Sequence, residues 1–481
     1  MDYKKIGLKC GLEIHRQLDT KSKLFCNCST RMIEKTPLTL IKRRQHPVQS
    51  ELGQVDVAAQ YEFLRDRVFH YQVFPSEDCL VESDEEPIHP LNQEALEIAL
   101  QIALLFKCKI PEEVHIMRKT VIDGSNTSAF QRTMIVGLDG YMEYDGRKVE
   151  ITHAALEEDA ASIVEEDEKN KTYKLNRLGV PLVEIGTGLL IGYTPEEVEE
   201  IAYFIGMTCR STEKVKKGLG TVRQDVNVSI KNGPRVEIKG IQELGLISKV
   251  IELEVQRQMS VPEVKKEVRA ANLDGTTKFT RPLPGAARMY PETDIPPIPI
   301  DRKMVQRIKK HLPESWIKKL KRFEKKLNLS EELAKQIIRS DYLDLFEKIV
   351  KKYRVNPSVA ANLFVSTLKD LKKRENIEVE KLEDEDFEEL FSLLKERKVM
   401  KEAIPEVLKY KVEHPDEPII VGVKKLGLQA ISDDELMMIV KEVIDKNKGA
   451  PEGKIIGFIM SRARGRVKSE NVVRIVKRLL K

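Results

Sequence analysis

The sequence has no long apolar run. No stretch of its 481 residues approaches the roughly 18 uninterrupted apolar side chains that a membrane-spanning helix needs. The chain starts Met1-Asp2-Tyr3-Lys4-Lys5 and leads directly into a strand-like pattern, so we expect neither a signal peptide nor a membrane anchor. Its six cysteines follow no regular spacing, which argues against a disulfide framework. Together these absences predict a protein of a reducing cytoplasm.

Common nucleotide-binding and nucleophile motifs are absent too. No Walker-type P-loop occurs, and no Gly-x-Gly-x-x-Gly pattern follows a strand-like run, so neither the P-loop nor the dinucleotide-binding fold is supported. No serine, threonine or cysteine stands in a convincing triad pattern, so nothing indicates a glutaminase within this chain. Aromatic residues make up 6% of the chain, which leaves few rings to stack on nucleic-acid bases.

Charge, in contrast, is abundant and unevenly distributed. Charged residues make up 33% of a chain that is long enough for roughly two to four domains. Residues 1–300 carry 40 basic and 46 acidic side chains, whereas residues 301–481 carry 42 basic and 31 acidic ones. The basic second part predicts a polyanionic partner.

The first polar pattern lies in Lys9–His15. Apolar and polar residues alternate strictly there, so Glu13 and His15 project from the same face of a predicted strand. A carboxylate and an imidazole in this arrangement can hold a divalent cation. An edge strand with ordinary polar residues is the alternative that this stretch alone allows.

A second alternating run, Val222–Ile230, predicts a β-hairpin. An Asn-Gly turn signal in Lys231–Pro234 follows it, and a third alternating run, Arg235–Lys239, comes next. One face of this hairpin gathers interleaved charges that a solvated sheet face seldom needs, namely Arg223, Asp225, Asn227, Arg235, Glu237 and Lys239. We therefore expect one mainly antiparallel sheet whose polar face forms the wall of a site.

Further polar groups occur between these strands. The run Leu156-Glu157-Glu158-Asp159-Ala160 is a short acidic cluster, for which a solvated turn is an equal alternative. Glu184 stands alone in the apolar run Gly179–Ile185, where a carboxylate needs a cation or a hydrogen-bonding partner. The small polar loop around Ser125, with Lys119 on its rim, can offer N–H and hydroxyl donors to an anion.

Three cysteines, Cys26, Cys28 and Cys79, are spaced so that they could bind one metal ion. A structural zinc needs four ligands, and only Glu82 or His89 is available as the fourth. We therefore expect small buried cysteines here rather than a zinc site.

Several helices are marked by apolar spacing and by caps. Helices are predicted over Asn92–Phe106 and Leu246–Val255, and Thr194-Pro195-Glu196-Glu197 reads as a helix start. From Ile300 onward the pattern is helical and basic, and Ser432-Asp433-Asp434-Glu435 starts a helix of the C-terminal tail. The fold class predicted from these patterns is α+β, with a sheet-rich N-terminal part followed by helices.

Five blocks of the sequence resemble the signature blocks of one family, the B and E subunits of tRNA-dependent amidotransferases. Four are Gly11–His15, Leu156–Ala160, Asn176–Ile185 and Arg223–Ser229. The fifth, Arg281–Asp294, is similar more specifically to the archaeal E branch of this family. The blocks occur in order over nearly the whole chain, so the resemblance extends beyond any single motif.

This resemblance implies an activity and its cofactors. ATP would phosphorylate the glutamate carried by tRNA(Gln), and ammonia would then displace the phosphate to give glutaminyl-tRNA(Gln). The positions implied to be catalytic and to bind Mg²⁺ are Glu13, His15, Glu158 and Glu184. Lys119 is implied to be catalytic near the incoming ammonia, and Arg223, Asp225 and Asn227 would border ATP or a second metal ion.

The resemblance also implies domains and partners. Residues 1–260 would form the catalytic domain, residues 261–404 a connecting segment and a helical cradle domain, and residues 405–481 a helical tail that recognises tRNA(Gln) by its shape. The basic tail residues that would contact tRNA are Arg462, Arg464, Arg466 and Lys468. Ammonia would come from an asparaginase-like partner, the D-type subunit, in a cytoplasmic heterotetramer of two D and two E subunits.

The sequence departs from the family pattern at one place, and two other functions are open to the chain. Members of the E branch usually carry an insertion resembling a domain of bacterial aspartyl-tRNA synthetases, whereas here the predicted helix ending near Met259 is followed directly by Val261. The chain could instead be a non-catalytic tRNA-binding subunit, or a ligase that acts on free amino acids. Intact acidic positions argue against the first alternative, and the basic tail argues against the second.

Overall fold

A computed structural model describes residues 1–33, 36–49, 53–218, 220–261, 264–285, 289–447, 449–463, 466–467 and 469–480. The chain divides into two compact units, Met1–Ser315 and Trp316–Lys481. The first unit is rich in mostly antiparallel strands and the second is helical, which confirms the predicted α+β class. The finer boundaries at residues 260 and 404 stay predictions.

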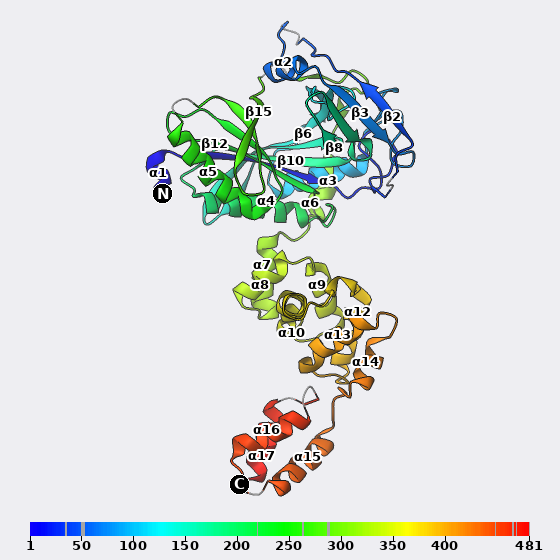
Figure 1. Ribbon diagram of the computed structural model, residues 1–481, viewed down its shortest axis with the longest axis vertical. Helices are drawn as coiled ribbons and strands as arrows, with labels where there is room; N and C mark the ends of the chain where they lie inside the picture. Colours follow the sequence, from blue (N-terminus) through cyan, green and yellow to red (C-terminus); the bar gives the residue numbers. More distant parts are fainter. Residues whose placement is uncertain are drawn as a thin grey trace. The chain divides into compact units, whose positions relative to one another are not determined.

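The first unit is built around one large sheet (Figure 1). Its strands are β1 (Lys9–Gln17), β5 (Met117–Thr120), β6 (Phe130–Tyr144), β7 (Arg147–Glu158), β10 (Pro181–Thr187), β11 (Leu190–Ile191), β12 (Val222–Ser229), β13 (Val236–Ile241), β14 (Glu267–Ala271), β15 (Thr277–Pro282) and β16 (Met289–Pro291). In the described part of the chain their order is β15-β14-β13-β12-β1-β10-β7-β6-β5-β16, with β11 paired to β1. The β13–β14 pair is parallel, and the strands around β1 are antiparallel.

Smaller elements complete this unit. A second sheet has the order β2 (Thr39–Arg43), β3 (Val68–Val73), β9 (Asn170–Lys174) and β8 (Ser162–Glu166), and β4 (Glu113–Val114) pairs with β17 (Ile298–Pro299). The helices are α1 (Tyr3–Ile6), α2 (Val57–Leu64), α3 (Gln93–Leu105), α4 (Pro195–Arg210), α5 (Ile247–Ser260) and α6 (Arg302–Lys310).

Helices α3, α4 and α5 cover one face of the large sheet (Figure 1). Cys10, Leu12 and Ile14 of β1 pack into this apolar core, and each is 1% exposed. Because neighbouring residues of a strand point to opposite faces, Glu13 and His15 lie on the face away from these helices. The alternation predicted for this stretch is thus confirmed.

Local sequence explains where key elements begin. The Thr194 side chain accepts a hydrogen bond from the N–H of Glu197, and the Glu197 carboxylate accepts one from the N–H of Thr194, so the predicted capping box starts α4. Asn92 caps α3 with a single hydrogen bond, which its side chain accepts from the N–H of Ala95. Asn232 has a φ of 63°, which an Asn-Gly turn between β12 and β13 accommodates readily.

The second unit is helical. Its helices are α7 (Trp316–Leu327), α8 (Glu331–Arg339), α9 (Leu343–Tyr353), α10 (Pro357–Asn362), a π-helical segment (Leu363–Thr367), α11 (Leu368–Arg374), α12 (Asp384–Lys395), α13 (Ile404–Glu413), α14 (Ile419–Lys425), α15 (Asp433–Lys446), α16 (Glu452–Arg462) and α17 (Ser469–Leu479). Helices α15, α16 and α17 share a separate apolar core that includes Leu436, Val440, Ile455, Ile459, Val472 and Val476. In the described residues, no helix has the length and apolar character that crossing a membrane would require.

Candidate functional site

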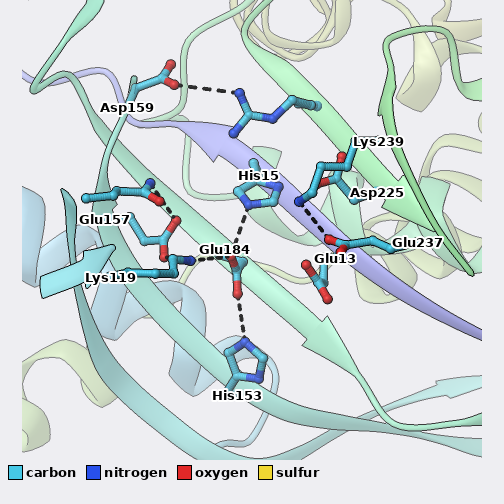
Figure 2. A network of polar contacts seen from close by, with 12 residues as sticks. Glu13, His15, Lys119, His153, Glu157, Asp159, Glu184, Asp225, Glu237 and Lys239 are labelled. Carbon is cyan, nitrogen blue, oxygen red and sulfur yellow. Dashed lines mark hydrogen bonds and ion pairs between the residues drawn. The ribbon is translucent and has the colours of Figure 1, made fainter. Parts of the chain in front are cut away.

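The register of three strands gathers polar side chains on the face of the large sheet that is opposite to α3, α4 and α5. β1 lies between β10 and β12, so His15 stands opposite both Glu184 and Arg223. Two residues earlier, Glu13 stands opposite Asp225. Figure 2 shows Glu13, His15, Glu184 and Asp225 converging from strands that are far apart in the sequence.

The first group on this face, which we call the His15 cluster, consists of His15, Glu157 and Glu184. Each offers one ligand atom, and these atoms lie within 4.8 Å of one another. His15 Nε2 is 3.0 Å from Glu184 Oε2, and His153 Nε2 is 2.9 Å from Glu184 Oε1. All three cluster residues are buried, with Glu157 only 1% exposed. One imidazole and two carboxylates are a suitable donor set for Mg²⁺ or Mn²⁺.

Lys119 of β5 compensates the charge of this cluster. Its Nζ is 3.0 Å from Glu157 Oε1 and 3.9 Å from Glu184 Oε2. Burial raises the pKa of the Glu184 carboxyl, but Lys119 and the two imidazoles outweigh burial and hold this pKa well below its usual value. Glu184 is therefore ionised at neutral pH, which is the form that binds a cation.

A second group, which we call the Asp225 cluster, consists of Glu13, Asp225 and Glu237. Their carboxylate oxygens also lie within 4.8 Å of one another. Lys239 Nζ is 2.9 Å from Asp225 Oδ2 and 2.7 Å from Glu237 Oε1, and the N–H of Gly240 donates to Asp225 Oδ1 over 3.1 Å. Burial raises the pKa of Asp225, but the nearby cations, Lys239 first among them, bring it down to about 2.

Glu158 points to the other face of the sheet. Its Oε1 accepts a hydrogen bond of 2.8 Å from the N–H of Arg132 and lies 3.6 Å from Arg132 Nη1. Strand alternation explains this, because Glu157 and Glu158 are neighbours in β7. The structure thus brings together Glu13, His15, Glu184 and Lys119 of the predicted catalytic set, with Glu157 at the position expected for Glu158. Both glutamates are buried, so they do not lie in a solvated turn.

The residues predicted to border ATP lie along β12 on the same face. Arg223 Nη1 is 3.8 Å from Asp159 Oδ1, and Gln17 Nε2 donates to Asp159 Oδ2 over 2.7 Å. Asn227 Nδ2 is 3.3 Å from Glu13 Oε1. Arg223 and Asn227 therefore lie on either side of Asp225 along β12.

Sequence reasoning missed His153 as a member of the site. His153 lies on β7 at the same parity as Glu157, and its imidazole binds Glu184. The alternation of β7 carries this signal, because residues 153, 155 and 157 must share a face once the strand is recognised.

A buried ion-pair group lies at the end of the sheet formed by β6, β5 and the edge strand β16. The Glu292 carboxylate accepts hydrogen bonds from the guanidinium groups of Arg118 and Arg132 and from the N–H of Asp294. Both guanidinium groups also lie over the Phe130 ring, with Arg118 Cζ at 4.7 Å and Arg132 Cζ at 4.9 Å from its centroid. Because Arg118 precedes Lys119 on β5, this group anchors the strand that carries Lys119.

We expect Glu292→Gln to lower the free energy of unfolding at neutral pH. We also expect this free energy to fall less steeply as the pH is lowered. Burial raises the pKa of Glu292, but Arg118, the N–H of Asp294 and Arg132 lower it to about 2. Since an unfolded glutamate has a pKa of about 4.3, this carboxylate contributes up to about 3 kcal/mol above pH ~5, and the contribution is lost as the pH falls toward 2.

Urea unfolding of the two proteins between pH 3 and pH 7 measures this effect. Asp294→Asn is the matched control. Asp294 Oδ2 is 3.3 Å from Arg118, which also binds Glu292, but the Asp294 side chain is 41% exposed. If the free energies of unfolding of wild type and Glu292→Gln changed in parallel across this pH range, the lowered pKa of Glu292 would be contradicted.

The three cysteines considered as metal ligands do come together. Cys26, Cys28, Cys79 and Glu82 each place a ligand atom within 4.8 Å of the others. The Cys26 thiol donates to Glu82 Oε1 over 2.9 Å. His89, the other candidate fourth ligand, contacts Glu86 instead.

Two of the four tail residues predicted to contact tRNA can be placed. Arg462 Nη1 is 2.9 Å from Glu442 Oε2, and Arg466 Nη2 is 3.1 Å from Glu435 Oε1. Arg464 and Lys468 lie outside the described residues. The two visible arginines therefore form ion pairs on the tail, at its surface.

Comparison with known proteins identifies the family. Residues 8–306 match the family model described as the GatB/GatE catalytic domain, and residues 344–480 match the model described as the GatB domain. The E subunit of glutamyl-tRNA(Gln) amidotransferase from Methanocaldococcus jannaschii is 36% identical over 628 aligned positions, which cover 100% of this chain and 99% of the relative. The protein of the same name from Saccharolobus solfataricus is 35% identical over 634 positions, with the same coverage of both chains.

These alignments also bear on the missing insertion. An alignment of 628 positions with a chain of 481 residues leaves at least 147 positions of the M. jannaschii protein without a counterpart. The relative is therefore longer within the aligned region, as expected if this chain lacks an internal segment. Matches to both family models in sequence order, together with identity of about 35% over the whole chain, show that this protein belongs to the GatB/GatE family of amidotransferase subunits.

Proposed function

We propose that this chain performs the ATP-dependent transamidation of Glu-tRNA(Gln) to Gln-tRNA(Gln), using ammonia supplied by a partner protein. The observation that carries the proposal is the His15 cluster, a buried group suited to a divalent cation, on a chain whose relatives are named as the E subunit of glutamyl-tRNA(Gln) amidotransferase. The reaction class is that of a ligase that forms a carbon–nitrogen bond.

The reaction proceeds in two balanced steps. The γ-phosphoryl group of ATP passes to the side-chain carboxylate of the tRNA-bound glutamate, which gives ADP and an acyl phosphate. Ammonia then attacks the acyl carbon, a C–N bond forms, and phosphate leaves while the nitrogen loses a proton. Both steps require anionic oxygens to be held close together, so the site must supply positive charge.

Mg²⁺ fits the His15 cluster. Its ligands would be His15, Glu157 and Glu184, and a cation held there would neutralise charge on the transferring phosphoryl group. The buried Nδ1 of His15 has no hydrogen-bond partner among the described residues, whereas its Nε2 faces Glu184. Glu13, predicted as a fourth ligand, lies in the adjacent Asp225 cluster, and Glu158 contacts Arg132 behind the sheet.

The chain's own cations orient the substrates. Lys119 lies beside both carboxylates of the His15 cluster, where its ammonium group can contact the acyl phosphate as ammonia arrives. Arg223 and Asn227 flank the site along β12 and are proposed to border the ATP phosphates, while Asp225 holds Lys239 in place beside them.

Partners follow from the chemistry and from the names of the relatives. We propose that an asparaginase-like partner of the D type releases the ammonia, that two D and two E subunits assemble in the cytoplasm, and that the helical tail binds tRNA(Gln). Because this tail has its own apolar core, it can carry tRNA contacts without altering the catalytic sheet.

A direct assay tests this function. Purified chain is incubated with ATP, MgCl₂, Glu-tRNA(Gln) and ammonium chloride, and glutaminyl-tRNA and ADP are quantified; ammonium replaces the partner. We expect both products to form in equal amounts. If neither forms even with the asparaginase-like partner added, while tRNA still binds, the chain is a non-catalytic tRNA-binding subunit. If free glutamate replaces Glu-tRNA(Gln) without loss of rate, it is a ligase of free amino acids.

The cysteine group is the other candidate metal site. Three thiols and one carboxylate within 4.8 Å match the four-coordinate donor set of a structural zinc, although the sequence favoured buried cysteines. We expect about one zinc per chain by elemental analysis of protein purified without chelators, and a loss of that zinc in Cys28→Ser. Less than about one tenth of an equivalent would support the original expectation of small buried cysteines.

A further inference from the structure

The Asp225 cluster already contains a cation of the protein's own. Lys239 Nζ lies 2.9 Å from Asp225 and 2.7 Å from Glu237, two of the three carboxylates that converge there. Burial lowers the pKa of Lys239, but attraction from Asp225, Glu237 and Glu13 outweighs it and keeps the ammonium group charged. Figure 2 shows the lysine lying alongside this acidic group.

The remaining oxygen of Asp225 is also occupied. Its Oδ1 accepts the N–H of Gly240, so the two oxygens of this carboxylate have separate internal donors. A metal ion entering the cluster would have to displace an ammonium group held by two short contacts. Such a displacement is unfavourable, because it would leave a lysine charge without its carboxylate partners.

The His15 cluster differs in the nature of its donors. Both oxygens of Glu184 face imidazole nitrogens, from His15 and His153, and an imidazole can give up its proton and become a ligand. Lys119 makes one short contact with this cluster, at 3.0 Å from Glu157 Oε1, and lies 3.9 Å from Glu184 Oε2, whereas Lys239 bridges two carboxylates of its cluster at 2.9 and 2.7 Å. An ammonium group, in contrast, has no lone pair to offer a metal ion.

We propose that Lys239 is the resident cation of the Asp225 cluster, so that the polar face of the sheet takes one divalent cation, in the His15 cluster, and excludes a second. The place of that first cation rests on the proposed function, whereas the exclusion of the second does not. Lys239 is 37% exposed, so its ammonium group also supplies fixed positive charge where a polyphosphate would otherwise need a second metal ion.

Titration of the full chain with Mn²⁺ tests this inference. Free Mn²⁺ is followed by electron paramagnetic resonance at pH 7.5 without nucleotide. We expect about one Mn²⁺ per wild-type chain, about two for Lys239→Met, and about one for the matched control Lys239→Arg, which keeps the cation. Adding Glu237→Gln to Lys239→Met should remove the new site, because it deletes a ligand. Lys239→Gln replaces the methionine variant if that one does not fold.

The outcomes separate the two proposals. Glu184→Gln should remove the wild-type Mn²⁺ and leave the site gained in Lys239→Met intact. If wild type binds no Mn²⁺ while Lys239→Met gains one, the metal assignment of the His15 cluster fails and the role of Lys239 stands. If wild type binds two ions and loses one in Glu237→Gln, or if neither Lys239→Met nor Lys239→Gln gains an ion, the inference is overturned.

Discussion

Glu157→Gln is expected to lower the rate of glutaminyl-tRNA formation by at least about 100-fold, whereas Glu158→Gln retains a rate within about threefold of wild type. The two residues are neighbours in β7 and carry the same charge, but they point to opposite faces of the sheet. Glu157 belongs to the His15 cluster, and Glu158 contacts Arg132 behind it. The measurement is the ammonium-supported assay with saturating ATP and Glu-tRNA(Gln).

Stability measurements serve as the control for this pair. Burial outweighs the attraction of Arg132 and raises the pKa of Glu158, so removing this charge should change the free energy of unfolding by less than about 1 kcal/mol while it spares the chemistry. Glu157→Gln should bind Mn²⁺ more weakly, and Glu158→Gln should bind it as wild type does. If both variants lost activity to a comparable degree, or if Glu158→Gln lost more, Glu158 would be a metal ligand, as the sequence predicted.

Deleting residues 432–481 is expected to raise the KM for Glu-tRNA(Gln) by about 10- to 100-fold and to change kcat by less than about threefold. The deletion removes α15, α16 and α17, which share their own apolar core, so the remaining chain keeps its packing. Salt dependence provides a second readout. Each phosphate contact that is lost should reduce the slope of log KM against log salt by about 0.7 to 0.9.

A charge-matched pair of variants tests whether the tail acts through its charge. Replacing the exposed tail residues Lys454, Arg474 and Arg478 by glutamine should reproduce part of the KM increase and of the change in salt slope. Replacing Lys4, Lys5 and Lys265, which are exposed in the other unit, removes the same charge and should leave both unchanged. An equal response to the two sets would mean that the effect comes from net charge alone.

Much of the fold could be predicted because local pattern and final structure agree. Strict alternation in Lys9–His15 placed Glu13 and His15 on one face, and the Asn-Gly signal placed the turn between β12 and β13. The capping box at Thr194 fixed the start of α4. Each of these features depends on neighbours within about ten residues, which a single sequence displays.

The parts of the site that depend on register could not be predicted from the residues alone. Choosing between Glu157 and Glu158 requires the parity of β7, which is set by its pairing with β10 and β6. Lys119 reaches the His15 cluster because β5 follows β6 and β7 in the sheet, an order that local sequence does not contain. The meeting of Cys79 and Glu82 with Cys26 is likewise a tertiary contact.

The ion-pair group around Glu292 could not be predicted from local sequence either. Arg118 and Arg132 lie more than a hundred residues before Glu292, and the β5–β16 pairing brings them together. Glu292 lies in the block Arg281–Asp294, which resembles the E branch of the family. No physical pattern within this block indicated a buried carboxylate. Lys239 was visible on the predicted hairpin face, whereas its place beside Asp225 and Glu237 depends on the register of the β12–β13 pair, in which Asn227 lies opposite Glu237.

Trapping the phosphorylated intermediate with hydroxylamine tests the central claim most directly. In the absence of ammonia, hydroxylamine attacks the acyl phosphate, so a γ-glutamyl hydroxamate forms and phosphate is released. Hydroxylamine also cleaves the ester between glutamate and tRNA, which gives the α-hydroxamate without enzyme, so the γ-linked product is separated from it and quantified alone. We expect the purified chain with ATP, Mg²⁺ and Glu-tRNA(Gln) to form this hydroxamate together with ADP, and Glu184→Gln to form neither while still binding tRNA. Hydroxamate formation by Glu184→Gln at the wild-type rate would show that the polar face around His15 is not where the phosphoryl group is transferred.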